Sequence, residues 1–180
     1  MKKRTKKAVL SLVAVLFLGA FPLSSCAKKP PDYFAYTQKN ASCEIAGTLH
    51  GSPFGARIVL LPIGEGCCAE IEYLQHPAWQ GLSIQARFDA SGRAVGTAEV
   101  RAYELSRTQT AASLSGLLAP LSALLEIREA RAVQFDKNAY TLTFADGALT
   151  VTQDGIPCKV SSETVDFWIV WWEKGEKSIQ

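Results

Sequence analysis

The sequence predicts a mainly β domain of the α+β class, built as a curved, open antiparallel sheet with a short helical insertion over its concave face. Three observations predict this fold. Short segments in which apolar and polar residues alternate recur along most of the chain. Turns rich in glycine, proline, serine and aspartate separate these segments. A single stretch of leucines at helical spacing interrupts the alternation.

The N-terminal segment is typical of a bacterial signal peptide. Residues 1–7 carry five positive charges and no acid, and residues 8–21 form an unbroken run of apolar and small side chains. This run is short for a hydrocarbon core of about 30 Å, which takes about 20 residues to cross. Leu23–Cys26 (Leu-Ser-Ser-Cys) follows and resembles the lipobox of bacterial lipoproteins. We therefore expect a signal peptide at 1–25 and lipidation of Cys26, with a plain secretory signal as the alternative.

Residues 26–32 form the predicted tether between the lipid and a single domain at residues 33–180. Lys28, Lys29 and two prolines follow the cysteine, a composition typical of a short, stiff linker that can touch anionic headgroups. Two or more acyl chains make a stable anchor where one is marginal. The predicted partner is thus a membrane, and the predicted location is the extracytoplasmic face of a cell membrane or outer membrane. Ala27, which is not an aspartate, is compatible with outer-membrane sorting.

The charge balance argues against nucleic acid as a partner. Five of the 19 basic residues lie in the signal peptide, so the mature chain has 14 basic residues against 17 acidic ones. The remaining basic residues form no cluster that would follow a phosphate backbone. No C-x-x-C or H-x-x-x-H spacing is present, so we expect neither a metal site nor a cofactor.

The first half of the domain is predicted to hold about five strands. Residues 32–61 form a strand, a turn and a second strand, and residues 67–75 form the next strand after a turn at 62–66. Apolar and polar residues alternate without a break over 82–89, which predicts a strand with one buried face. Residues 94–105 form the last strand of this half.

A stripe of leucines predicts the helical insertion, which we expect to begin at about Ser106. Pro120 lies in the middle of the stripe, and a proline removes a backbone donor and clashes one turn back, so we expect two short helices or a kink there. Ser106 or Thr108 is expected to cap the start. The stripe consists of Leu114, Leu117, Leu118, Leu121, Leu124 and Leu125.

Strand patterns return after the insertion and bring the expected total to seven or eight. Residues 140–151 predict a hairpin around the turn at 145–148. The last strand, at 165–172, is apolar on both faces apart from Asp166. Alternation places Trp168 and Trp172 on one face and Trp171 on the other. We favour a role in the core and in covering an edge over a dedicated binding patch.

The order of elements resembles the LolA/LolB-like half-barrel of outer-membrane lipoprotein-sorting proteins. The matching features are the lipobox, the paired strands around Gly51–Pro53, the loop Pro77–Leu82, the Leu114–Leu125 insertion, and Gly155–Pro157 before the final strand. The resemblance implies a cavity for an apolar group such as a lipid acyl chain. The residues expected to line it are Phe88, Leu114, Leu117, Leu118, Leu121, Phe144, Trp168 and Trp171.

Four cysteines remain in the mature domain. In an exported protein an even number permits two disulfides. The adjacent pair would not bridge itself easily, because neighbouring residues of a strand point to opposite faces. Two disulfides and four free buried thiols are about equally favoured. These residues are Cys43, Cys67, Cys68 and Cys158.

No catalytic motif is expected, and we predict that the protein is not an enzyme. His50 and Ser52 flank a turn in which glycine and serine are common anyway. Glu70 and Glu72 share a strand face, which indicates a solvated surface more strongly than a cation site. The leading hypothesis is a membrane-anchored protein that binds a hydrophobic ligand. The alternative is a cell-envelope interaction or structural module with a fully packed core.

Overall fold

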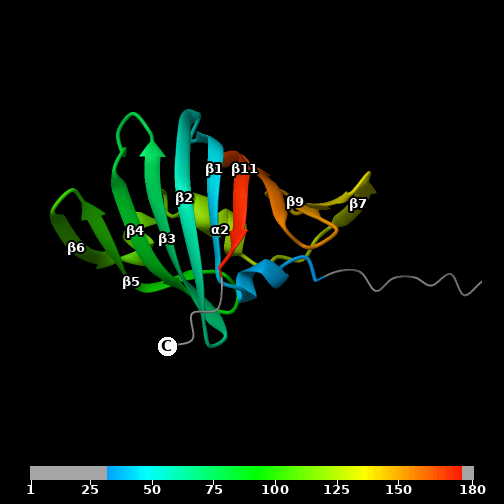
Figure 1. The fold of residues 1–180 in the computed structure, drawn as a ribbon, viewed down its shortest axis with the longest axis horizontal. Helices are drawn as coiled ribbons and strands as arrows, with labels where there is room; N and C mark the ends of the chain where they lie inside the picture. Colours follow the sequence, from blue (N-terminus) through cyan, green and yellow to red (C-terminus); the bar gives the residue numbers. More distant parts are fainter. Residues whose placement is uncertain (1–31, 176–180) are drawn as a thin grey trace, which may run out of the picture. The chain divides into compact units, whose positions relative to one another are not determined.

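The computed structural model describes residues 32–175 as one open, antiparallel sheet of eleven strands (Figure 1). The predicted signal peptide, Cys26 and most of the predicted tether lie outside the described residues. The mainly β fold with a curved open sheet and a short helix is confirmed, although the sequence predicts only seven or eight strands. The strands are β1 (Ala41–Leu49), β2 (Ser52–Ile63), β3 (Gly66–Gln75), β4 (Leu82–Phe88), β5 (Ala94–Ala102), β6 (Leu105–Thr110), β7 (Ala132–Asp136), β8 (Ala139–Thr143), β9 (Gly147–Thr152), β10 (Pro157–Ser162) and β11 (Val165–Lys174).

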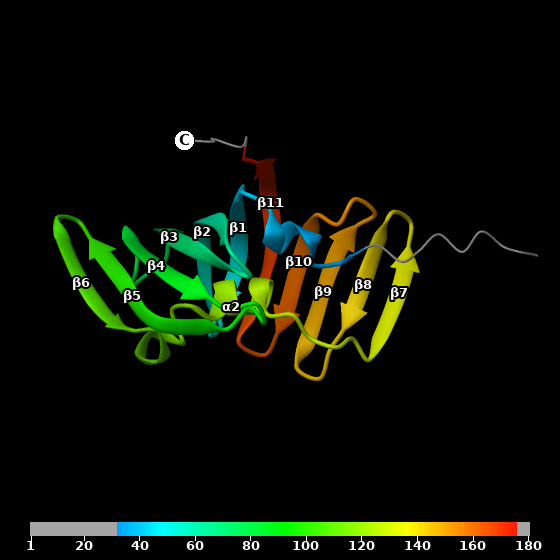
Figure 2. The same cartoon turned by 90° about the horizontal axis from the view of Figure 1, so that it is seen from below.

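The strand order is β6-β5-β4-β3-β2-β1-β11-β10-β9-β8-β7. All neighbours except β1 and β11 are consecutive along the chain, so the sheet consists of two meanders joined where the first strand pairs with the last. The edge strands β6 and β7 are connected by the helical insertion. In Figure 2 the sheet curves around this insertion, with α2 (Ala119–Leu125) in its hollow.

The helical insertion is present as predicted, but it begins later in the chain than the sequence predicts. It contains a 3-10 turn, η2 (Ala111–Leu114), and then α2, so the predicted pair of short helices is present. Pro120 lies in the first turn of α2, where a missing N–H costs nothing. However, Ser106 and Thr108 belong to strand β6 and do not cap a helix. β6 is exposed along its whole length, so it shows no apolar alternation from which a strand could be predicted.

The core lies between the concave face of the sheet and the insertion. Leu118, Leu121 and Leu124 are completely buried against residues of the inner face such as Ile58 and Ile71. A second 3-10 turn, η1 (Ala35–Gln38), contributes the buried Tyr36. The leucine stripe therefore serves as the cover of the sheet. No helix within residues 32–175 is long and apolar enough to span a membrane.

A bulge in β11 changes the predicted faces of the tryptophans. Glu44 of β1 pairs with Trp171, and the next residue, Ile45, pairs with Ile169, which leaves Val170 as the extra residue. Trp172 consequently points inward and packs against Tyr36, with ring centroids 5.8 Å apart. The prediction that Trp168 and Trp172 share a face is wrong, because simple alternation does not survive a bulge.

Candidate functional site

Most of the residues predicted to line a ligand cavity pack together in the core of the domain. Five of its eight expected lining residues are buried in the core: Phe88, Leu114, Leu118, Leu121 and Phe144. Leu117 is partly buried and packs against the same core. The leucines of the insertion occupy the space that the curved sheet would otherwise leave open.

Trp168 and Trp171 do not lie with the other predicted cavity residues. They pair with Ala46 and Glu44 of β1, and these two residues point away from the buried Cys43 and Ile45. Directly opposed residues of an antiparallel pair share a face. Both tryptophans therefore lie on the outer, convex face of the sheet.

Together with Val170 they form the outer tryptophan patch, defined as Trp168, Val170 and Trp171. Their exposed fractions are 58%, 67% and 46%. The amino group of Lys159 lies 4.7 Å from the centre of the Trp168 ring and 3.4 Å from a carboxylate oxygen of Asp166. This cation–π contact positions the ring of Trp168. Ala46, which pairs with Trp168, has a side chain too small to cover the ring.

The outer face beyond the patch is polar and internally paired. Arg57 lies between Glu44 and Glu72, at 3.2 Å and 3.7 Å. Ser83 donates a hydrogen bond of 2.6 Å to Glu70. Both predicted acidic residues of β3 are thus engaged by neighbours. Among residues 32–175 no group of three or more histidine, cysteine or acidic side chains is placed to hold a metal ion.

Hydrogen bonds from two tyrosines attach the insertion to the rest of the domain. The hydroxyl of Tyr36 donates to the backbone carbonyl of Leu124 at 2.5 Å. The hydroxyl of Tyr73 donates to the backbone carbonyl of Leu117 at 2.6 Å. Burial raises the pKa of both tyrosines well above the ordinary value, so both remain donors across the physiological pH range.

Arg128 also attaches the insertion to the sheet. Its Nη1 donates to both carboxylate oxygens of Asp146, at 2.8 and 2.9 Å, and its Nη2 donates to the carbonyl of Ala123 at 3.1 Å. The guanidinium also lies 4.7 Å from the centre of the Phe144 ring. One side chain thereby joins the end of α2 to the β8–β9 hairpin.

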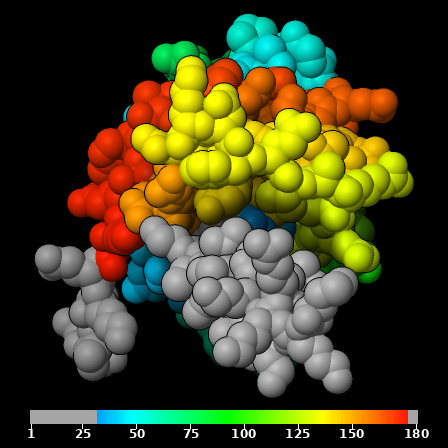
Figure 3. Space-filling model, turned by 90° about the vertical axis from the view of Figure 1, so that its right-hand side faces the viewer, coloured from blue at the N-terminus to red at the C-terminus, as the bar shows by residue number. Residues whose placement is uncertain are grey.

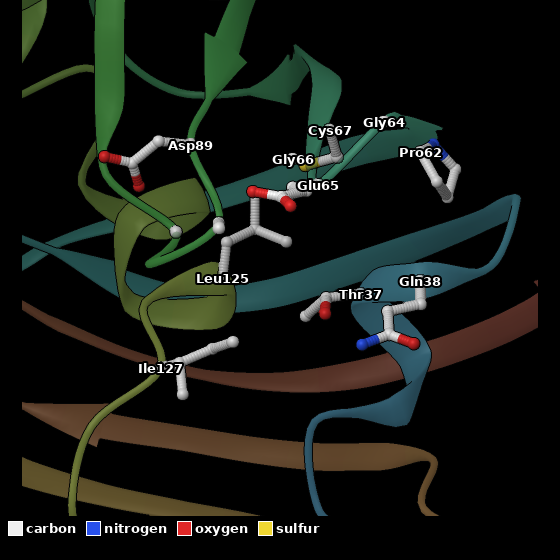
Figure 4. Close-up of a pocket in the computed structure, with 12 residues that line it drawn as sticks. Thr37, Gln38, Pro62, Gly64, Glu65, Gly66, Cys67, Asp89, Leu125 and Ile127 are labelled. Atoms are coloured by element: carbon white, nitrogen blue, oxygen red, sulfur yellow. The ribbon is translucent and has the colours of Figure 1, made fainter.

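A hollow of about 400 Å³ opens at one end of the insertion (Figure 4). Its wall is mainly polar and backbone-rich, with Leu125 and Ile127 as its aliphatic members from the insertion. Asp89 is occupied within its own turn, where it accepts hydrogen bonds from Ser91 and Arg93 that lower the pKa of its carboxyl. The lining residues are Thr37, Gln38, Pro62, Gly64, Glu65, Gly66, Cys67, Asp89, Ala90, Gly92, Leu125 and Ile127.

The four cysteines of the described chain are free thiols in the structure. Burial raises the pKa of Cys43 to about 12 and that of Cys67 to about 11, so both are protonated at neutral pH and are poor nucleophiles. Cys68 and Cys158 are half-buried. Disulfide formation remains a prediction.

The histidines serve local structure. The ring of His76 stacks on Trp79 with centroids 3.9 Å apart, and its Nδ1 accepts a hydrogen bond from the backbone N–H of Ala78. His50 lies in the β1–β2 turn with a positive φ of 50°. Its position in a tight turn matches the structural explanation given for the His50–Ser52 pair.

Comparison with solved structures finds proteins of similar fold. The match to a crystal structure of an uncharacterized conserved protein from Thermus thermophilus covers 82% of this chain and 86% of the Thermus chain, with a TM-score of 0.54 and 11% sequence identity. The chain is a half-barrel-like, mainly β protein. MucB, solved in complex with MucA(peri), matches 83% of this chain and 56% of its own, with a TM-score of 0.41 and 17% identity. No protein-family model and no curated protein matches the sequence.

Sequence reasoning missed the residues that close the half-barrel. Tyr36, Tyr73 and Arg128 act across 88, 44 and 18 residues of chain, respectively. A lone tyrosine inside an alternating strand looks like any other core residue. The partners of these three side chains depend on strand register, which local pattern does not specify.

Proposed function

We propose that this protein is a lipid-anchored extracytoplasmic interaction module of the LolA/LolB-like type, with a packed core and an external working surface. The observation that supports the proposal is the outer tryptophan patch on a domain in which the insertion already covers the centre of the concave face. Tryptophan is enriched among residues that dominate protein interfaces, because its large apolar surface gains much when water is excluded. A soluble domain exposes such a group at a cost unless a partner covers it.

The position of the patch favours a protein partner over a role in covering an edge. β11 lies in the middle of the sheet between β1 and β10, so the patch covers no edge strand. The bulge at Val170 places two rings outward where simple alternation would have turned Trp171 inward.

Site-specific crosslinking in cells tests this proposal. A photoreactive phenylalanine analogue in place of Val170 should yield one defined crosslinked protein. The same analogue in place of Thr108, an exposed residue of β6 on the same sheet, is the control. Trp168→Ser should remove the Val170 crosslink and leave folding intact, because the ring is largely exposed. Equal crosslinking from both positions, or persistence in Trp168→Ser, would refute the proposal.

A hydrophobic ligand is the second candidate, favoured by the hollow beside Leu125 and Ile127. Movement of the insertion would join this hollow to the leucine-lined core. Native mass spectrometry of the Cys26→Ser chain, before and after incubation with a fatty acid, tests it. Uptake of one fatty acid that Ile127→Asp abolishes is the expected result. A domain that stays free of ligand under these conditions excludes this candidate.

A further inference from the structure

The concave apolar rows of the sheet continue past the insertion to the β7 edge. Across β9, β8 and β7 one row runs Val151, Tyr140, Phe135, and the next runs Leu149, Leu142, Val133. Burial fades along both rows: Val151 is completely buried, whereas Phe135 is 53% and Val133 47% exposed. The insertion covers the centre of the sheet and leaves these outer residues open.

The beginning of the described chain joins this area. The ring of Tyr33 lies 5.3 Å from that of Tyr140, which in turn lies 4.7 Å from Phe135. We call Tyr33, Val133, Phe135 and Tyr140 the terminal aromatic shelf. In Figure 3 the β7–β8 edge lies on the surface, beside the strands β9–β11.

The composition of the shelf suits the headgroup layer of a bilayer. Phenylalanine and valine supply apolar contact, and tyrosine rings are enriched where apolar and wet regions meet. The exposed Arg131 and Lys137 flank β7 at its two ends, and Asp136 is the acidic residue of the strand. Two cations beside exposed apolar groups match an anionic lipid surface.

The tether limits how far the shelf can be from the predicted anchor. Asp32 is the sixth residue after Cys26, and a fully extended segment of that length spans at most about 20 Å. Asp32 directly precedes Tyr33 of the shelf. A bilayer that holds lipids on Cys26 is therefore held within reach of the shelf at a high effective concentration, so even weak contacts become occupied.

We propose that the terminal aromatic shelf rests on the surface of the bilayer that holds the anchor, with its rings in the headgroup layer. The proposal rests on the lipid anchor of the proposed function and adds an orientation to it. The shelf lies on the concave side, whereas the outer tryptophan patch lies on the convex face. Docking of the shelf would turn the patch away from the membrane, toward a partner.

Quenching by brominated lipids tests the orientation with the native tryptophans as an internal control. The lipidated chain is purified from bacterial membranes and placed in vesicles of phosphatidylethanolamine and phosphatidylglycerol, with or without bromine on the acyl chains. The chain has four tryptophans, none in the shelf, so the wild type should lose little emission. Phe135→Trp should lose the emission of the added indole, at most the share of one tryptophan among five. Tyr103→Trp, at the opposite end of the sheet and 95% exposed, should lose none.

The controls separate the failure of the anchor from the failure of the shelf. Flotation of the vesicles should recover the wild type and not the Cys26→Ser chain. A wild type that fails to float overturns both the anchor and the orientation. A protein that floats while Phe135→Trp is quenched no more than Tyr103→Trp overturns the shelf alone, and would leave β7 open to a protein strand. Strong quenching of the wild type would place native tryptophans at the membrane and also overturn the orientation.

Discussion

Arg128 shows how a single side chain closes the half-barrel. It contacts Asp146, the carbonyl of Ala123 and the ring of Phe144 at once. Its side chain is only 18% exposed, and its Nε is buried without a hydrogen-bond partner in the structure. The contacts made by the rest of the guanidinium must therefore offset the cost of burying a charged group.

Replacement of Arg128 is predicted to loosen the insertion. Arg128→Met should lower the free energy of unfolding by about 1–3 kcal/mol, because it removes charge-assisted hydrogen bonds from a mostly buried position. Arg57→Met is the matched control: its ion pairs are about half exposed, and such pairs are worth about 0–1 kcal/mol. Urea unfolding measures both. Equal losses in the two variants would show that Arg128 does not fasten the insertion.

The buried thiols predict a loss of stability in alkali. The pKa of Cys43 is raised from 9.0 to about 12, and that of Cys67 from 9.0 to about 11, because burial disfavours the thiolate. A raised pKa in the folded state contributes stability below the unfolded value that disappears as pH rises toward the folded value. The free energy of unfolding of the reduced protein should therefore fall between about pH 9 and 11.

The variant Cys43→Ala, Cys67→Ala should show a shallower fall from about pH 9 to pH 10, measured by urea unfolding. Above that range Tyr36 and Tyr73 act in the same direction, because burial raises the pKa of each phenol above 10.0. An unchanged slope in the variant would mean that the thiols ionise as easily in the folded protein as in the unfolded chain.

At the scale of elements, the seam between β1 and β11 depends on a close approach at Gly47. A Cβ added there would overlap the carbonyl oxygen of Asp166 and lie 2.5 Å from the Cα of Phe167. Gly47→Ala should cost about 2–4 kcal/mol or more, since the backbone of β11 cannot move without disturbing the core beneath it. Gly55→Ala in β2 is the control, because its nearest contact would be at 3.6 Å. A tolerated Gly47→Ala in thermal unfolding would contradict the rigid seam.

The elements also show what the sequence can and cannot predict. Alternation predicts β4 almost to the residue, and the position of Pro120 predicts the break between η2 and α2. Alternation misses β6 and β7, because exposed edge strands have no buried face to impose a pattern. It also misses the interior strand β10, in which only Pro157 and Val160 are buried, too few to show an alternation. The bulge at Val170 escapes prediction because it depends on pairing with β1, at the other end of the domain, and local pattern carries no information on such pairing.

The candidate site is predicted less well than the fold. The leucine stripe correctly indicates an element packed on the concave face, yet the stripe cannot show whether a cavity remains beneath it. That outcome depends on how the volumes of residues such as Leu118, Leu121 and Phe88 add up across the core. Trp168 and Trp171 stand out in the sequence as unusual, but the bulge determines which face they occupy.

At the scale of the whole molecule, the two edges of the sheet differ. β6 presents Arg107 and a series of hydroxyl side chains, whereas β7 presents Val133 and Phe135 with no lysine, arginine or proline inside the strand. Unprotected edges pair with other chains. The Cys26→Ser chain, free of a membrane, should therefore self-associate at high concentration.

Val133→Lys should suppress this association, because it places a charge on the open edge, whereas Thr108→Lys on β6 should not. Light scattering or sedimentation velocity measures the effect. Equal suppression by both lysines would indicate a general charge effect and would exclude β7 as the contact.

The pairing of the first strand with the last makes β11 the element that completes the sheet during folding. While β11 is still missing, the six strands before the insertion and the four that follow it are two separate sheets with no shared backbone hydrogen bonds. A truncated or stalled product therefore exposes the edge of β1 and the unfinished core, which proteases and chaperones recognise. Only a chain that includes β11 can pair the edge of β1 and complete the core between the two meanders.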